Sequence, residues 1–139
     1  MFQSVKELIE ICEKENKKIY EVMIEQEISV TKLSKEEVYK NMERNLDTME
    51  KAIERGINGV TSTTGLTGMD AVLLQDYLES GKSLSGDLMI DAVSKAVATN
   101  EVNAAMGKIC ATPTAGSAGV APGVLFALKK RLNPSREDM

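Results

Sequence analysis

Apolar positions recur at helical spacing along the first third of the chain. The first stripe consists of Val5, Leu8, Ile9 and Cys12. Its spacing of i, i+3, i+4 and i+7 predicts an amphipathic helix. Ser4 and the glutamate three residues later form the capping-box pattern at its start. A second short helix is expected over the segment "KIYEVMIEQEISV".

A longer apolar stripe follows another capping-box pattern, Ser34 with Glu37. The stripe consists of Val38, Met42, Leu46, Met49 and Ile53. It predicts a long helix that ends at Gly56, because glycine is the common residue just past a helix C-terminus. The charged residues of this first part are expected on the solvent side of the helices.

The composition changes after Gly56, and small residues dominate up to Gly123. Helices are predicted over about 69–80, over about 86–107 and from near Pro122 to a point before Pro134. The helix over 86–107 carries alanine and other small residues on nearly every face, which predicts a central, buried helix. We therefore expect an all-α fold with Gly/Thr/Ser-rich loops, little or no sheet, and a single domain over 1–139 made of a charged part (1–56) and a loop-rich part (57–139).

Charge and hydropathy exclude several classes of partner. The 139 residues are 42% hydrophobic, enough for one core, and carry a net charge of −4. An acidic chain with 4% aromatic residues is not expected to bind nucleic acid or an anionic membrane surface. The N-terminal segment has acids among its apolar residues, so neither a signal peptide nor a membrane span is predicted, and we expect a cytoplasmic protein.

Residue usage also limits the chemistry. The chain has no histidine, so a Ser-His-Asp or Cys-His apparatus cannot be assembled within it. Its two cysteines, Cys12 and Cys110, are far apart in the sequence and are expected to be reduced thiols. No metal ligands are predicted in this chain.

Two octads share the pattern T-x-T-x-G-x-x-G: "TSTTGLTG" at 61–68 and "TPTAGSAG" at 112–119. Each precedes a predicted helix, where free backbone N–H groups and the helix dipole favour an anion. Neither octad has the P-loop or dinucleotide-binding pattern, so the expected anion is a carboxylate. One such loop alone is more often a plain helix cap or tight turn. Two at identical spacing favour convergence on one pocket, and two halves of a pseudo-repeat that stack are an equal alternative.

The predicted central helix carries few polar residues. Asp91 and Lys95 are spaced i, i+4 and are expected to pair. Asn100 and Asn103 lie on one face, and with Glu101 they are expected to bind neighbouring loops, with a ligand as the alternative.

The blocks "GVTSTTGLTGMDA" and "SGKSLSGDLMIDAVSKAVATNEVNAAMGKICATPTAGSAGVAPGVLFALKKRLNPSRE" resemble the alpha chain of the bacterial iron–sulfur-dependent L-serine dehydratases. The opening "MFQSVKELIEI" is similar to that chain's usual start, so the resemblance covers essentially the whole sequence. It implies a pyridoxal-independent lyase that converts L-serine to pyruvate and ammonia. A four-iron four-sulfur cluster acts there as a Lewis acid on the serine hydroxyl, while a base removes the α-proton.

The resemblance also implies a serine pocket and partners. The expected substrate-binding residues are Thr63, Thr64, Gly65, Thr67, Gly68, Thr112, Thr114, Gly116, Ser117 and Gly119, supported by Lys95, Asn100 and Asn103. The implied partners are L-serine and a serine dehydratase beta chain, and a homo-oligomer is a further expectation.

The family's alpha chain continues beyond the length of this one, and neither cysteine here matches a cluster ligand. The chain thus resembles an N-terminal portion, for which we expect no cluster and no dehydratase activity on its own. Two alternatives remain: a non-enzymatic helical module that binds small anions, and a structural partner subunit in which the octads are packing surface.

Overall fold

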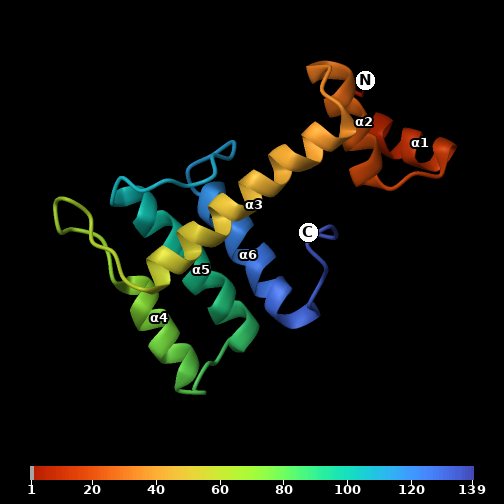
Figure 1. Cartoon of the computed structure of the whole chain (residues 1–139). Helices are drawn as coiled ribbons and strands as arrows, with labels where there is room; N and C mark the ends of the chain where they lie inside the picture. Colours follow the sequence, from red (N-terminus) through yellow and green to blue (C-terminus); the bar gives the residue numbers. More distant parts are fainter. Residues whose placement is uncertain (1) are drawn as a thin grey trace. The chain divides into compact units, whose positions relative to one another are not determined.

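The computed structural model describes residues 2–139, and six α-helices account for the regular structure of that part of the chain (Figure 1). They are α1 (Val5–Glu15), α2 (Ile19–Thr31), α3 (Lys35–Ile57), α4 (Asp70–Glu79), α5 (Asp87–Ala104) and α6 (Ser117–Leu132). An isolated antiparallel bridge between Thr61 and Gly68 is the single β-type pairing within residues 2–139. The predicted all-α fold is confirmed.

The chain separates into two compact units, Met1–Arg44 and Asn45–Met139. Their boundary lies inside α3, twelve residues before the change in composition at Gly56. We call them unit 1 and unit 2. The single domain expected from the sequence stays a prediction.

Unit 1 is shaped by its helix caps. The Ser4 hydroxyl accepts the N–H of Glu7 at 3.2 Å, and the Glu7 carboxylate accepts the N–H of Gln3 at 2.7 Å, one residue before the expected donor. At the start of α3, Ser34 and Glu37 form the full capping box: the Ser34 N–H donates to the Glu37 carboxylate at 2.8 Å, and the Glu37 N–H donates to the Ser34 hydroxyl at 3.2 Å. Local side-chain bonds therefore fix where these helices begin.

Helices α1 and α2 pack on each other, and Val22 of α2 is buried. Lys17, in the turn between them, contacts the carboxylates of Glu15 at 2.7 Å and Glu25 at 2.8 Å. The hydrogen bond and charge of Lys17 hold the pKa of Glu15 below its usual value, and the Lys17 pKa is raised by its bonds to Glu15 and Glu25. The turn is thus tied to α2 by an exposed ion network.

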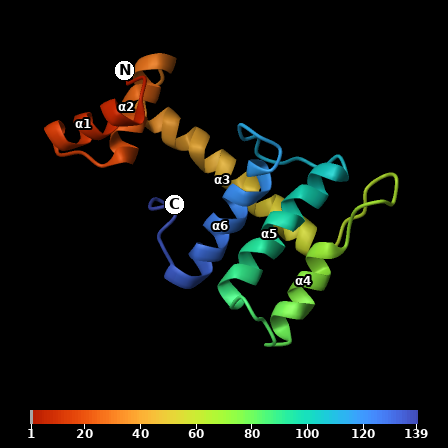
Figure 2. The ribbon, with the colours of Figure 1, turned by 180° about the vertical axis from the view of Figure 1, so that it is seen from behind.

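Unit 2 is organised around α5, which lies between α4 and α6 in both views of the molecule (Figures 1 and 2). Ala98, Thr99 and Val102 of α5 are fully buried or nearly so, which confirms the predicted central helix. Both neighbours run antiparallel to α5, because the start of α4 and the start of α6 each lie beside its C-terminal half.

Glycines allow the helices of unit 2 to approach closely. A Cβ atom on Gly123 of α6 would lie 2.6 Å from the Ala92 carbonyl oxygen, and one on Gly119 would lie 2.7 Å from that of Ala96. A Cβ atom on Gly56 of α3 would collide with the backbone of Ala98. The expectation that Gly56 ends α3 is wrong, since the helix runs to Ile57 and the glycine is a buried crossing point.

Helix α6 begins at Ser117, so the expected start near Pro122 is wrong. Proline favours the first turn of a helix, which motivated that expectation. Here Pro122 is buried inside the helix, where its missing N–H leaves the Ala118 carbonyl without the usual i−4 donor. The Thr114 hydroxyl instead accepts the N–H of Ser117, the first residue of α6.

Ion pairs join the C-terminal part of unit 2 to the second half of α3. Lys129 of α6 and Arg136, which follows α6, both contact the carboxylate of Glu50, the latter at 3.2 Å. Arg136 also pairs with Asp47. None of the helices within residues 2–139 combines the length and apolar character that a membrane span requires.

Candidate active site

The last turns of α5 stand between the N-termini of α4 and α6, the two helices that follow the octads. On one side, the Glu101 carboxylate accepts the backbone N–H of Asp70 at 2.7 Å and that of Ala71 at 3.3 Å. On the other side, the Asn100 amide lies within 2.8 Å of the place where Gly119 would carry a Cβ atom. Each octad precedes a helix, as predicted, and both of these helices begin beside the same end of α5 (Figures 1 and 2).

The first octad, 61–68, is a tight hairpin. The Ser62 N–H donates to the Thr67 carbonyl at 2.8 Å, and the Gly65 N–H donates to the Ser62 carbonyl at 2.9 Å. Gly68 has φ of +138°, and a Cβ atom there would collide with the Val60 carbonyl, so both conformation and space require glycine. The side chains of Thr63, Thr64 and Thr67 are exposed.

The anion at the N-terminus of α4 is a side chain of the protein itself. Glu101 is 5% exposed and bonds the first two amides of that helix. A carboxylate at this position satisfies free N–H groups and faces the positive end of the helix dipole. The sequence predicted that Glu101 anchors a neighbouring loop, whereas its carboxylate bonds the start of helix α4, directly after the first octad.

The second octad, 112–119, holds a cluster of three hydroxyls at the start of α6. The Ser117 N–H donates to the Thr114 hydroxyl and the Thr114 N–H donates to the Ser117 hydroxyl, both at 3.1 Å. These reciprocal bonds resemble a capping box, but they join Thr114, before the N-cap residue Gly116, to Ser117, the first residue of α6. The Thr112 hydroxyl lies 2.5 Å from that of Ser117 and donates to the Thr114 carbonyl at 3.1 Å.

The other polar residues of α5 pair within the helix, bond α4 or lie exposed. Lys95 pairs with Asp91 as predicted, and their side chains are 12% and 7% exposed. Ser94 hydrogen-bonds Gln75 of α4 at 2.7 Å and donates to the Ala71 carbonyl at 3.3 Å. Asn100 and Asn103 are exposed at the octad end.

Most of the predicted site residues lie at one end of unit 2, but they make different structural contacts there. Gly119 is buried against α5, and Gly68 closes the first hairpin. Lys95 is paired within α5, one to two turns away from Asn100 and Asn103. No hydrogen bond among the described residues joins one octad to the other, and their role in binding serine stays a prediction. The Thr114–Ser117 cap was missed because its Thr-x-x-Ser pattern lacks the usual glutamate.

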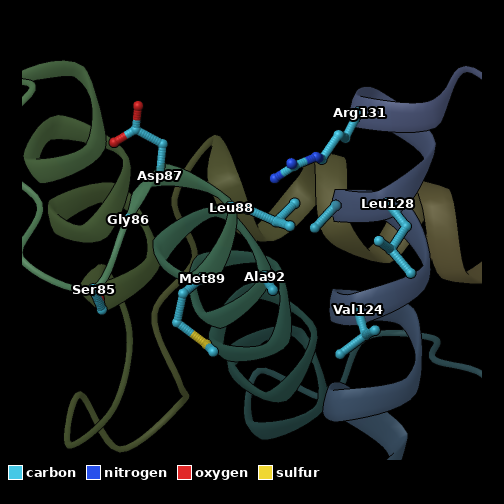
Figure 3. Close-up of a pocket in the computed structure, with 10 residues that line it drawn as sticks. Ser85, Gly86, Asp87, Leu88, Met89, Ala92, Val124, Leu128 and Arg131 are labelled. Atoms are coloured by element: carbon cyan, nitrogen blue, oxygen red, sulfur yellow. The ribbon is translucent and has the colours of Figure 1, made fainter.

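A shallow groove of about 470 Å³ lies at the opposite end of α5, between its first turns and the second half of α6 (Figure 3). Apolar side chains line most of it, with Asp87 and Arg131 at its rim. The lining contains none of the predicted site residues.

Comparison with known proteins decides the family. Residues 14–139, almost the whole chain, match the family described as "Serine dehydratase alpha chain". The chain belongs to the serine dehydratase alpha chain family. The resemblance to this family, which rested on the octads and the sequence blocks around them, is confirmed.

Curated relatives carry the corresponding names. The chain is 65% identical over all 139 residues to the "Probable L-serine dehydratase, alpha chain" of Bacillus subtilis (strain 168), covering 46% of it. It is 36% identical over 138 residues to the "L-serine dehydratase, alpha chain" of Peptoniphilus asaccharolyticus, covering 98% of this chain and 47% of that one. For "L-serine dehydratase TdcG" of Escherichia coli (strain K12) the identity is 33%, with 98% of this chain and 31% of that protein covered.

The chain thus spans about half the length of these alpha-chain relatives. No solved structure matches it. The iron–sulfur cluster that the resemblance implies does not fit the residues present. Three thiolates are the minimum for a cluster with one open iron, and the chain has two cysteines. Residues 2–139 hold no group of three or more histidine, cysteine or acidic side chains placed for a metal.

Proposed function

We propose that this chain is part of the alpha subunit of an L-serine ammonia-lyase (L-serine dehydratase), which deaminates L-serine to pyruvate and ammonia. The observation that carries the proposal is the 65% identity, over all 139 residues, to a relative of that name. The octads lie within the matched range of the family. They are the part of the chain whose chemistry suits a small carboxylate.

In this proposal the octad end of α5 binds the amino acid. The hydroxyls of Thr112, Thr114 and Ser117 bond one another and the Thr114 carbonyl, and their hydrogens can rotate to donate to a carboxylate that replaces these bonds. The amides of Asn100 and Asn103 each offer a donor and an acceptor, which suits a molecule with both a carboxylate and an ammonium group. Thr63, Thr64 and Thr67 of the first octad add exposed hydroxyls.

The glycines of the octads have a supporting part. Gly65 and Gly68 let the first loop turn, and Gly119 lets α6 approach α5. Lys95 is held by Asp91 and supports the site through α5 instead of touching serine.

The proposal places the ligands of the four-iron four-sulfur cluster outside these 139 residues, and it involves no pyridoxal phosphate. The 139-residue chain alone is therefore expected to be inactive. Activity requires the remaining alpha-chain sequence and a serine dehydratase beta chain, in a cytoplasmic assembly that can include further copies of this chain.

The test is anaerobic co-expression of this chain with the remaining alpha segment and the beta chain of the Bacillus subtilis relative. The assembly is loaded with iron and sulfide, and pyruvate formed from L-serine is followed. We expect turnover with the wild-type chain, a strong loss with Ser117→Ala, and retained turnover with Thr114→Ser, which keeps the hydroxyl.

A cluster-loaded, folded assembly without turnover would refute the lyase assignment. Binding of serine or another carboxylate to the 139-residue chain, without turnover in that assembly, would favour the anion-binding module instead.

A further inference from the structure

Glu101 connects the two octads through a single turn of α5. Its carboxylate takes the first amides of α4, and its neighbour Asn100 lies against the first turn of α6 at Gly119. Adjacent residues of one helix thus contact the two helices that the octads precede. The contact with α4 is long-range, spanning 31 residues of sequence.

We infer that Glu101 is a positioning residue that holds the first octad at a fixed separation from the second. The inference rests on the proposed function, in which both octads serve one substrate. Glu101 does not touch serine in this arrangement, because both of its oxygens accept backbone N–H groups and the residue is 5% exposed. It acts by fixing α4, and through α4 the hairpin of 61–68.

A second consequence concerns where a carboxylate ligand can bind. The N-terminus of α4 already holds a carboxylate, and a second anion beside it would be repelled. The α-carboxylate of serine is therefore left to the hydroxyl cluster of the second octad and the tip of the first. The first octad contributes its exposed threonines and not the amides of α4.

Glu101→Gln is the informative change, because it keeps the size of the side chain while it removes the charge and one of two acceptors. The matched control is Gln75→Leu. Gln75 also links α4 to α5, through Ser94 at 2.7 Å, but lies a turn further along α4 from the octad. Both changes weaken the same helix pair, and Glu101→Gln alone releases the end that carries the hairpin.

The first readout needs no activity. Spin labels are placed at Leu66→Cys and Ala115→Cys, two exposed octad positions, in the full 139-residue chain with Cys12→Ser and Cys110→Ser. Pulsed electron resonance then gives the distribution of label separations. We expect Glu101→Gln to broaden it by about twofold and to speed amide exchange at Asp70 and Ala71 by about 10- to 100-fold. Gln75→Leu is expected to unfold at a urea midpoint similar to that of Glu101→Gln, while the label distribution and the amide exchange stay as in wild type.

The second readout is kinetic, in the assembled enzyme. Loss of positioning is expected to raise KM for L-serine about tenfold in Glu101→Gln with kcat changed less than about threefold. Glu101→Asp, which keeps the charge, is expected to fall between Glu101→Gln and wild type in both readouts.

An unchanged label distribution in Glu101→Gln, or a broadening equal to that in Gln75→Leu, overturns the inference. If the wild-type assembly shows no turnover, the lyase proposal fails, and the label distances and amide exchange alone still decide whether Glu101 fixes the octads.

Discussion

Gly123 of α6 lies against Ala92 of α5 so closely that a Cβ atom on residue 123 would stand 2.6 Å from the Ala92 carbonyl oxygen. The same helix pair is equally tight one turn earlier, at Gly119 and Ala96. Backbone contact of this kind leaves no room for a methyl group, and a closely packed interior relaxes only in part. The α5–α6 pair is therefore fixed in both distance and rotation.

Gly123→Ala is expected to lower the free energy of unfolding by about 1–3 kcal/mol, since α6 must shift away from α5. The control is Gly116→Ala. Residue 116 has φ of −65° and nothing near its missing Cβ, so alanine there is expected to be neutral or to stabilise by about 0.4–1 kcal/mol. Urea unfolding of both variants checks the difference, and equal midpoints would contradict the close contact.

The first octad provides a second glycine comparison. Gly68→Ala is expected to open the 61–68 hairpin, because the new methyl group meets the Val60 carbonyl and φ is +138°. Gly65 has φ of +71° and open space, so Gly65→Ala costs only the left-handed strain of about 1 kcal/mol and keeps the hairpin. Amide exchange at Ser62, which donates to Thr67, reports the outcome. Retained protection in Gly68→Ala would refute the hairpin.

The reciprocal cap at the start of α6 predicts coupled effects. Thr114→Ala and Ser117→Ala are each expected to destabilise by about 1 kcal/mol. Each change removes hydrogen bonds that the other residue also needs, so the double variant should cost less than the sum, with a coupling of about 0.5 kcal/mol or more. Thermal unfolding of the four proteins measures it, and strict additivity would argue against the cap.

The Asp91–Lys95 pair is buried, so removing one partner leaves a charge without compensation. Lys95→Met is expected to destabilise by about 3 kcal/mol, and adding Asp91→Leu is expected to recover most of the loss. The exposed pair Lys6–Glu10 has the same i, i+4 spacing with side chains 87% and 59% exposed, and Lys6→Met there should change stability by less than about 1 kcal/mol. Denaturant titrations of the variants test the contrast, which fails if Lys95→Met and Lys6→Met cost the same.

The α3 cap gives a pH dependence. Hydrogen bonds from Ser34 hold the pKa of Glu37 below its usual value. The backbone N–H has the larger effect and the hydroxyl the smaller one. A lowered pKa in the folded state means that the cap stabilises α3 above the unfolded pKa of about 4.3 and that this contribution disappears as pH falls through the folded value. Carboxyl NMR titration should show Ser34→Ala raising the Glu37 pKa, with Ser29→Ala as a control that leaves it unchanged. An unmoved pKa in Ser34→Ala would contradict the assignment.

Local signals in the sequence predicted most of the helices because their causes are local. Ser34 and Glu37 are three residues apart, and the apolar stripe through Leu46 and Ile53 needs only helical spacing. The error at Gly56 came from a long-range contact. Gly56 was interpreted as a helix end because its partner, Ala98, lies in another helix and cannot be seen in the local pattern.

The candidate site shows the same division. The octad pattern correctly predicted loops that precede helices, since threonine and glycine favour caps and turns. The sequence could not show that the hydroxyls of Thr114 and Ser117 satisfy each other, or that Glu101 supplies the anion at α4 from 31 residues away. The first is a local turn that lacks the usual glutamate, and the second depends on the packing of unit 2.

Helix α5 contacts a different helix on each of three faces, so its length is constrained as well as its sequence. Ala98 faces α3, Ala92 and Ala96 face α6, and Ser94 with Glu101 faces α4. One residue inserted in the middle of this helix would rotate everything downstream by about 100° and break the register with α3, α4 and α6 together. The loop at 61–68 has no such register to keep at its tip, so insertions there are expected to be tolerated while α5 keeps its length.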